Sequence, residues 1–191
     1  MIWTAQTPLY LPLTYGDNIL RATHRLADDV GAAFGARPEL RPQPAPFGQP
    51  AILISPDPAY TSAIAPAWSQ TFVAQTEGPE LTVTGADGLG TILGLAWLST
   101  KLLGEGAGPQ REFELHFELP RWADRVRAWS FTVGELAEQD LGELCWALLK
   151  HGGNTLGVVS EVPAEVSAAA AELGLKTAAV ETATGRTDGW W

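Results

Sequence analysis

The sequence has little positive charge. Its 191 residues include 12 lysines and arginines against 22 aspartates and glutamates, which gives a formal net charge of −10 at pH 7. A surface of this sign repels the phosphates of nucleic acids and the headgroups of anionic membranes, so we expect neither as a partner. Because 46% of its residues are hydrophobic, the chain can nevertheless bury a core.

Cysteine and long apolar runs are also scarce. Cys145 is the only cysteine, so no disulfide can form within the chain. No stretch of about 18 apolar residues could span a bilayer as a helix. The first residues, MIWTAQTPLYLPL, lack the positively charged start and the small-residue cleavage site of a signal peptide. We therefore expect a soluble, cytoplasmic protein.

Few residues could hold a metal or act as a nucleophile. His24, His116 and His151 lie far apart, without the spacing of metal ligands, so we expect neither a metal nor another cofactor. Cys145 lies on the apolar face of a predicted helix, where core packing is the simpler interpretation. No G-x-S-x-G motif of a serine hydrolase occurs.

The first part of the chain alternates helical and strand patterns. Apolar residues spaced three or four apart predict a helix that Asp17 or Asn18 caps and that Gly35 ends. The proline-rich stretch Arg37–Pro50 predicts a loop. Strands are predicted over Ala51–Ser55, Thr71–Gln75, Leu81–Gly85 and Glu112–Leu119, and a second helix is predicted to end at Gly104.

A glycine-rich turn precedes this second helix. Gly85, Gly88, Gly90 and Gly94 nearly match the G-x-G-x-x-G fingerprint of dinucleotide-binding proteins, but the last spacing is one residue too long. The turn also follows strands that look antiparallel, and no acidic residue ends a following parallel strand about 20 residues later. We favour a structural interpretation: Asp87 caps the helix, Gly88 takes a conformation that other residues avoid, and the last two glycines let the helix lie close to the sheet.

After Pro120 the pattern changes to strand, helix, strand, helix, strand. Single helices between strands imply parallel pairing with right-handed crossovers. We place a domain boundary near Leu119–Ala123, which divides the chain into domains 1–122 and 123–191. The strands are predicted over Val126–Val133, Asn154–Ser160 and Leu175–Thr182, and the helices over Glu138–Gly153 and Pro163–Gly174.

Two stretches resemble a known family. They are W-S-Q-T-F-V at Trp68–Val73 and L-T-V-T-G-A-D-G-L-G-T-I-L-G-L-A-W-L-S at Leu81–Ser99. They resemble the N-terminal domain of glycoside hydrolase family 115, the xylan α-1,2-glucuronidases, whose motif is I-x-G-x-D-x-R-G-T-I-Y-G-x-Y-x-L-S. Related domains precede the catalytic barrels of β-hexosaminidases and other α-glucuronidases. The early helix, with A-T-H-R-L-A-D-D-V at Ala22–Val30, fits the same domain.

Later segments follow the order of the same family. Arg125–Glu135 corresponds to its first barrel strand, Leu141–Gly157 to a helix and the next strand, and Ala168–Thr182 to a further helix and strand. The resemblance implies an α/β fold. It consists of an N-terminal α+β domain, in which two helices pack on a mixed sheet, followed by a partial (β/α) barrel of two to three βα units.

The chain also departs from the family pattern. The family's N-D-E after the first barrel strand becomes Val133, Gly134 and Glu135, and its W-P becomes Gly157-Val158 while Asn154 is kept. Its aromatic run after the glycine helix and its H-H-E after the third strand are replaced by other residues. The family's catalytic acid and base are expected farther downstream, so the catalytic residues stay unknown.

Four residues are candidates for substrate binding. Glu135, Glu161 and Glu181 follow predicted parallel strands, and side chains at the carboxyl ends of such strands line the active sites of (β/α) barrels, together with Ser160 and Thr182. Asn154 is a candidate through the family resemblance. Carboxylate pairs are the groups that hydrolyse glycosides. The alternative is structural, because acids at such positions also cap the following helix.

These observations leave three functional hypotheses. The first is a glycoside-hydrolase-like, carbohydrate-active protein that is catalytically incomplete, either a remnant or an accessory piece that binds an oligosaccharide or polysaccharide. The second is an active glycosidase completed in trans, by a homodimer or by a separately encoded remainder of the barrel, since two or three βα units leave open strand edges. The third and weaker hypothesis is a nucleotide-binding α/β domain.

Overall fold

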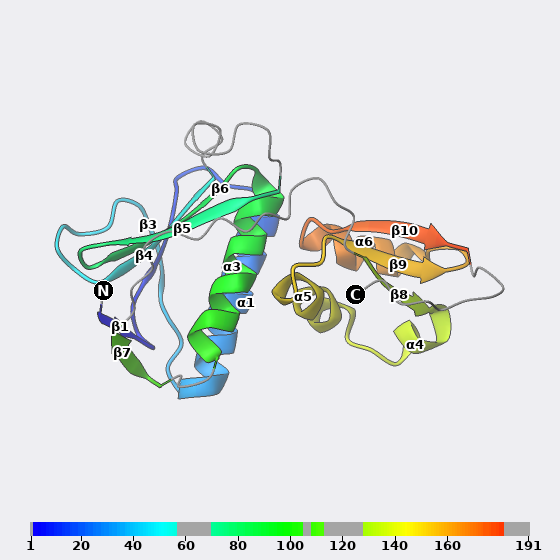
Figure 1. Cartoon of the computed structure of the whole chain (residues 1–191), viewed down its shortest axis with the longest axis horizontal. Helices are drawn as coiled ribbons and strands as arrows, with labels where there is room; N and C mark the ends of the chain where they lie inside the picture. Colours follow the sequence, from blue (N-terminus) through cyan, green and yellow to red (C-terminus); the bar gives the residue numbers. More distant parts are fainter. Residues whose placement is uncertain (1, 57–69, 105–107, 113–127, 182–191) are drawn as a thin grey trace.

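The computed structural model describes residues 2–56, 70–104, 108–112 and 128–181 (Figure 1). The predicted domain boundary, His116, Thr182 and most of the strand predicted over Glu112–Leu119 lie outside the described residues. The first residue of that predicted strand belongs to a short strand, β7 (Gln110–Glu112), which pairs antiparallel with β1 (Ile2–Thr4).

A five-stranded mixed sheet forms the first unit of the chain. Its strand order is β3-β2-β4-β6-β5, with β5 antiparallel to β6 and the other neighbours parallel. Three of the strands were predicted, whereas β2 and β3 were not. The strand β3 lies inside the segment predicted as a loop. The bounds are β2 Leu9–Leu11, β3 Leu40–Pro42, β4 Ala51–Pro56, β5 Phe72–Glu77 and β6 Glu80–Gly85.

Two helices, α1 (Asp17–Phe34) and α3 (Gly88–Leu103), pack on one face of this sheet (Figure 1). Gly35 ends α1 in the left-handed conformation, with φ of 71°, as predicted. The predicted cap is wrong. Gly16 is the N-cap residue, since its backbone is extended and its carbonyl accepts from the amides of Ile19 and Leu20.

The glycines of the turn before α3 serve packing, as the structural interpretation predicts. A Cβ on Gly90 would collide with the carbonyl oxygen of Thr71, and one on Gly94 would lie 2.6 Å from Cγ1 of Val83. The prediction for Gly88 is wrong, because its φ is not positive and an added Cβ would meet nothing within 4 Å. The sheet and α3 therefore approach at two specific glycines.

The second unit is a three-stranded parallel sheet with the order β10-β9-β8, which confirms the predicted alternation of strands and helices. The short helix α4 was not predicted. The strands are β8 Ala128–Thr132, β9 Thr155–Val159 and β10 Lys176–Val180, and the helices are α4 Val133–Ala137, α5 Leu141–Lys150 and α6 Ala164–Glu172.

A single core joins the two units. The helices α1 and α3 lie between the five-stranded sheet and the helix pair α5 and α6, and α3 contacts α5 directly (Figure 1). Leu26 of α1, Leu95 of α3, Trp146 of α5 and Leu156 of β9 belong to one cluster of buried side chains. The chain thus has the predicted α/β class, with a mixed sheet and two helices followed by parallel βα units. None of the helices within the described ranges has the length and hydrophobicity needed to cross a membrane.

Candidate functional site

The predicted acidic residues gather at one edge of the parallel sheet. The register places Thr132, Val159 and Val180 side by side at the ends of β8, β9 and β10. Glu181 directly follows the end of β10, Glu161 follows the end of β9 after Ser160, and both glutamates are exposed. The third acid, Glu135, lies in α4, which begins directly after β8. In Figure 1 the strands point toward this edge and away from the first unit.

Glu135 is held by hydrogen bonds to the residue that ends β8. Its Oε2 accepts from the backbone N–H of Thr132 at 2.7 Å and from the Thr132 hydroxyl at 2.8 Å, and its own amide donates to that hydroxyl. This reciprocal arrangement is a capping box at the start of α4. The hydrogen bonds from the Thr132 backbone and hydroxyl lower the pKa of Glu135. The carboxylate is therefore an acceptor that is already engaged, as the structural alternative predicts.

The turn after β9 has an unusual backbone. Ser160 has a φ of 86°, in the region that residues with a side chain rarely adopt. Its amide donates to the carbonyl of Val180 across the sheet at 3.3 Å. Glu161 follows it and borders an open hollow of about 800 Å³ along α6, together with residues such as Pro163 and Ser167. Strain at a strand end is a recurrent feature of functional sites.

Asn154 lies at the opposite edge, before β9 begins. It is buried, and its Nδ2 donates to Oε1 of Gln70 at 2.8 Å. The backbone N–H of Gln70 in turn donates to Oδ2 of Asp87, the residue that caps α3. The structure therefore brings three of the four candidates to one edge and places Asn154 in a joint between the two units.

In the glycine-rich turn before α3, one of the first helix amides is already engaged by the cap residue. Oδ1 of Asp87 accepts from the amide of Gly90 at 2.6 Å. A phosphate at a helix N-terminus needs such amides. The contact therefore favours the structural interpretation of the turn.

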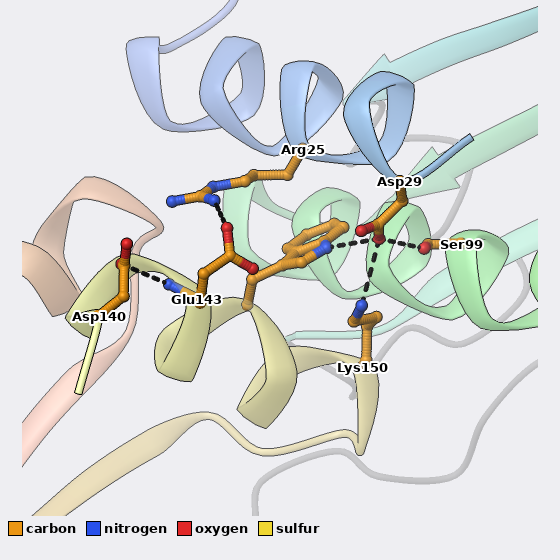
Figure 2. Close-up of polar contacts among 7 residues, drawn as sticks. Arg25, Asp29, Ser99, Asp140, Glu143 and Lys150 are labelled. Carbon is orange, nitrogen blue, oxygen red and sulfur yellow. Dashed lines mark hydrogen bonds and ion pairs between the residues drawn. The ribbon is translucent and has the colours of Figure 1, made fainter. Parts of the chain in front are cut away.

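The sequence did not predict the cluster of polar side chains around Asp29, which lies in the joint between the two units. Oδ2 of Asp29 in α1 accepts from Oγ of Ser99 at 2.5 Å, from Nε1 of Trp146 at 2.8 Å and from Nζ of Lys150 at 3.2 Å (Figure 2). Ser99 and the Trp146 ring are fully buried. Asp29 thus links α1, α3 and α5 at one oxygen atom.

Two ion pairs extend this joint along α1. Arg25 pairs with Glu143 of α5 (Figure 2), and Arg21 pairs with Glu172 of α6 at 2.8 Å. Arg21, Arg25 and Asp29 follow one another at intervals of four residues, so all three lie on one face of α1. This i, i+4, i+8 stripe of charges is the signal that the sequence offered.

The remaining reactive residues are buried or scattered. Cys145 is buried in the core, and desolvation raises the pKa of its thiol to about 11. A thiol of this kind is a packing residue rather than a nucleophile. Nowhere in the described ranges do three side chains of histidine, cysteine, aspartate or glutamate gather as metal ligands would.

Solved structures of glycoside hydrolases resemble most of the chain. One is the GH20 β-N-acetylhexosaminidase from Streptomyces coelicolor A3(2), with a TM-score of 0.62 and 15% identity over 92% of this chain and 42% of that one. Another is the Flavobacterium johnsoniae chitobiase, also GH20, with a TM-score of 0.59 and 12% identity over 93% of this chain and 31% of that one. A GH138 enzyme targeting pectin rhamnogalacturonan II has a TM-score of 0.61 and 13% identity over 90% of this chain and 24% of that one.

These likenesses establish a glycoside-hydrolase-like fold. No protein-family model matches the chain, and neither does any curated protein. The chain spans less than half the length of the glycoside hydrolases named above. The more specific resemblance to family 115 stays a prediction.

Proposed function

We propose that the chain is part of a carbohydrate-active protein of the glycoside-hydrolase kind and is catalytically incomplete by itself. This proposal rests on the unequal shares of the two chains that each structural superposition covers. At least 90% of the chain superposes on each of the three glycoside hydrolases, yet it accounts for 24–42% of their length. In this view the chain supplies a supporting unit and the first strands of a (β/α) barrel, and its ligand is an oligosaccharide or polysaccharide.

The geometry of the strand-end acids supports the incomplete state. Glycoside hydrolysis needs two carboxyl groups, one of them protonated when the bond breaks. Glu135 is engaged by Thr132 and its pKa is lowered, which is the wrong direction for a proton donor. Glu161 and Glu181 are exposed to solvent, and neither contacts the other in any hydrogen bond found among the described residues.

The test is hydrolysis by the purified chain. Glucuronoxylan oligosaccharides test the α-glucuronidase resemblance by release of 4-O-methylglucuronic acid, and a chromogenic N-acetyl-β-glucosaminide tests the likeness to GH20. Glu135→Gln is compared with Glu138→Gln, an exposed control at the C-terminal end of the same helix, α4. We expect no release from a chain shown to be folded by its melting curve. Release that only Glu135→Gln abolishes would show that the chain builds a working site.

A second candidate is a glycosidase whose barrel another chain completes. Within the described residues β8 and β10 pair only with β9, and Ala128, Ser130, Ala178 and Ala179 of these edge strands are exposed. Unpaired edges of this kind favour pairing with another chain. Sedimentation equilibrium tests the homodimer directly. Activity that appears only on addition of a protein carrying the missing strands would support a separately encoded partner.

Ligand binding without hydrolysis separates the first proposal from the nucleotide-binding alternative. A change in tryptophan fluorescence with xylo-oligosaccharides is expected if the chain binds sugar. A rise in melting temperature with a nicotinamide dinucleotide, and none with sugar, would favour the nucleotide instead. Such a ligand would have to displace Asp87 from the amide of Gly90.

A further inference from the structure

A separate hollow of about 310 Å³ lies on the first unit, between the start of α1 and the strands β2 and β3. Leu11, Leu20, Leu40 and Pro42 give it apolar walls. Its remaining lining includes the side chains of Tyr15, His24 and Arg41. Apolar walls with a few convergent polar groups are typical of small-molecule sites, and this volume is at the lower end of their range.

Arg41 supplies a fixed positive charge. Its Nε and Nη2 donate to Oε2 of Glu39 at 2.9 and 2.6 Å, whereas its Nη1 makes a long contact of 3.5 Å with the hydroxyl of Tyr10. The hydrogen bond with Glu39, and then that with Tyr10, raises the pKa of Arg41. A guanidinium carries five N–H donors and no acceptor, so Nη1 has donor capacity left for a ligand.

His24 adds a second donor. Its Nδ1 lies 2.9 Å from Nη2 of Arg37. Because the guanidinium can only donate, Nδ1 accepts, and the neutral ring then carries its proton on Nε2. The nitrogen groups that line the hollow are therefore donors, and the hydroxyl of Tyr15 can also donate. A ligand that satisfies all three must present hydrogen-bond acceptors.

We propose that this hollow binds a compact organic monocarboxylic acid, with its carboxylate on Arg41 and its apolar body against the leucines and Pro42. A carboxylate matches a set of groups that can all donate, and its hydrogen bonds with a guanidinium are among the stronger ones in proteins. A fully hydrated inorganic anion fits less well, because it has no apolar part to place against the apolar walls. This inference does not depend on the proposed glycosidase relationship, because it uses none of the residues at the strand ends.

Glu39 makes the proposal testable in both directions. Its carboxylate already occupies two nitrogens of Arg41 and would repel an incoming anion. Removing the Glu39 charge should therefore strengthen binding, whereas removing the Arg41 charge should weaken it. A purely structural role for the pair would make both substitutions act alike.

The experiment is a titration of the full chain with benzoate, followed by amide chemical shifts in heteronuclear NMR, with neutral benzamide as the matched control. We expect a dissociation constant of about 1–10 mM for a ligand of this size, with shifts centred on residues 11–15, 20–24 and 40–42. Benzamide and Arg41→Gln should each weaken binding about tenfold, and Glu39→Gln should strengthen it about threefold.

Several results would overturn the proposal. They are equal binding of benzamide, unchanged binding by Arg41→Gln, weaker binding by Glu39→Gln, or shifts centred elsewhere on the chain. Because Glu39 and Arg41 are both exposed, neither substitution should unfold the protein, and the spectrum of each free variant verifies this directly.

Discussion

Replacing Asp29 should separate its role as an acceptor from its role as a charge. In Asp29→Ala the hydroxyl of Ser99 and the indole N–H of Trp146 lose their shared acceptor, and both side chains are fully buried. Leaving a buried donor unpaired costs about 1–3 kcal/mol. The third donor, Lys150, is 29% exposed and can turn to water, so its loss adds at most about 1 kcal/mol. The two buried donors together predict a total loss of about 2–6 kcal/mol, with Lys150 adding little.

Two variants make this prediction specific. Asp29→Asn keeps an oxygen that accepts from Ser99 and Trp146, so it should cost only about 1–2 kcal/mol. Asp28→Ala removes the neighbouring carboxylate, whose ion pair with Arg37 is exposed, and should change stability by less than about 0.5 kcal/mol. Urea unfolding followed by tryptophan fluorescence measures all three. The reasoning is refuted if Asp29→Ala is no more destabilised than Asp28→Ala.

Three further predictions follow from particular contacts. Gly94→Val should lower the melting temperature strongly because α3 would be pushed off the sheet, whereas Gly88→Ala should melt like the wild type, and equal melting of the two would contradict the packing argument. Cys145 should resist alkylation at pH 8 until the protein is unfolded, and rapid labelling of the native protein would count against this. The raised pKa also means that the neutral thiol stabilises the fold below its unfolded pKa near 9. This contribution should be lost as the pH rises toward 11. Glu135 should titrate below its ordinary pKa of 4.5 in a carboxyl NMR titration; its stabilisation of α4 should be complete above that pH and be lost as the pH falls through the lowered pKa. Thr132→Ala removes the hydroxyl but keeps the backbone N–H, so it should move the pKa of Glu135 only part of the way back up; an unchanged value in the variant would show that the hydroxyl does not contribute to the shift.

The sequence predicts the longer elements because their periodicity is strong. The helix α1 and the strand β6 each bury a regular set of apolar residues, so several positions in each element support the same secondary-structure prediction. Short strands lack this redundancy. The strand β3 has three residues and ends in Pro42, in a proline-rich segment that predicts a loop. It forms at the edge of the sheet, where a proline need not donate to a neighbouring strand.

The joint between the two units could be predicted only in part. The charged stripe of Arg21, Arg25 and Asp29 is visible in the sequence as a four-residue repeat. Its partners are not, because Ser99 and Trp146 lie 70 and 117 residues from Asp29 along the chain. An exposed face of ion-paired residues and a partly buried contact between two units give the same sequence pattern. Only the side-chain contacts of α1 with α5 distinguish them.

The two edges of the parallel sheet have different surroundings, and this difference bears on the proposed function. At the amino edge Asn154 is buried and bonded to Gln70 of the first unit. At the carboxyl edge Glu161 and Glu181 are exposed, and the strands point away from the first unit (Figure 1). A ligand bound at the carboxyl edge would therefore not contact the joint. It follows that Glu161→Gln should alter ligand binding without altering stability, whereas Asn154→Ala should lower stability by about 1–3 kcal/mol, because it leaves Gln70 without this donor. Urea unfolding and sugar titration of both variants test this separation, and loss of sugar binding in a stable Asn154→Ala would instead place the ligand at the joint.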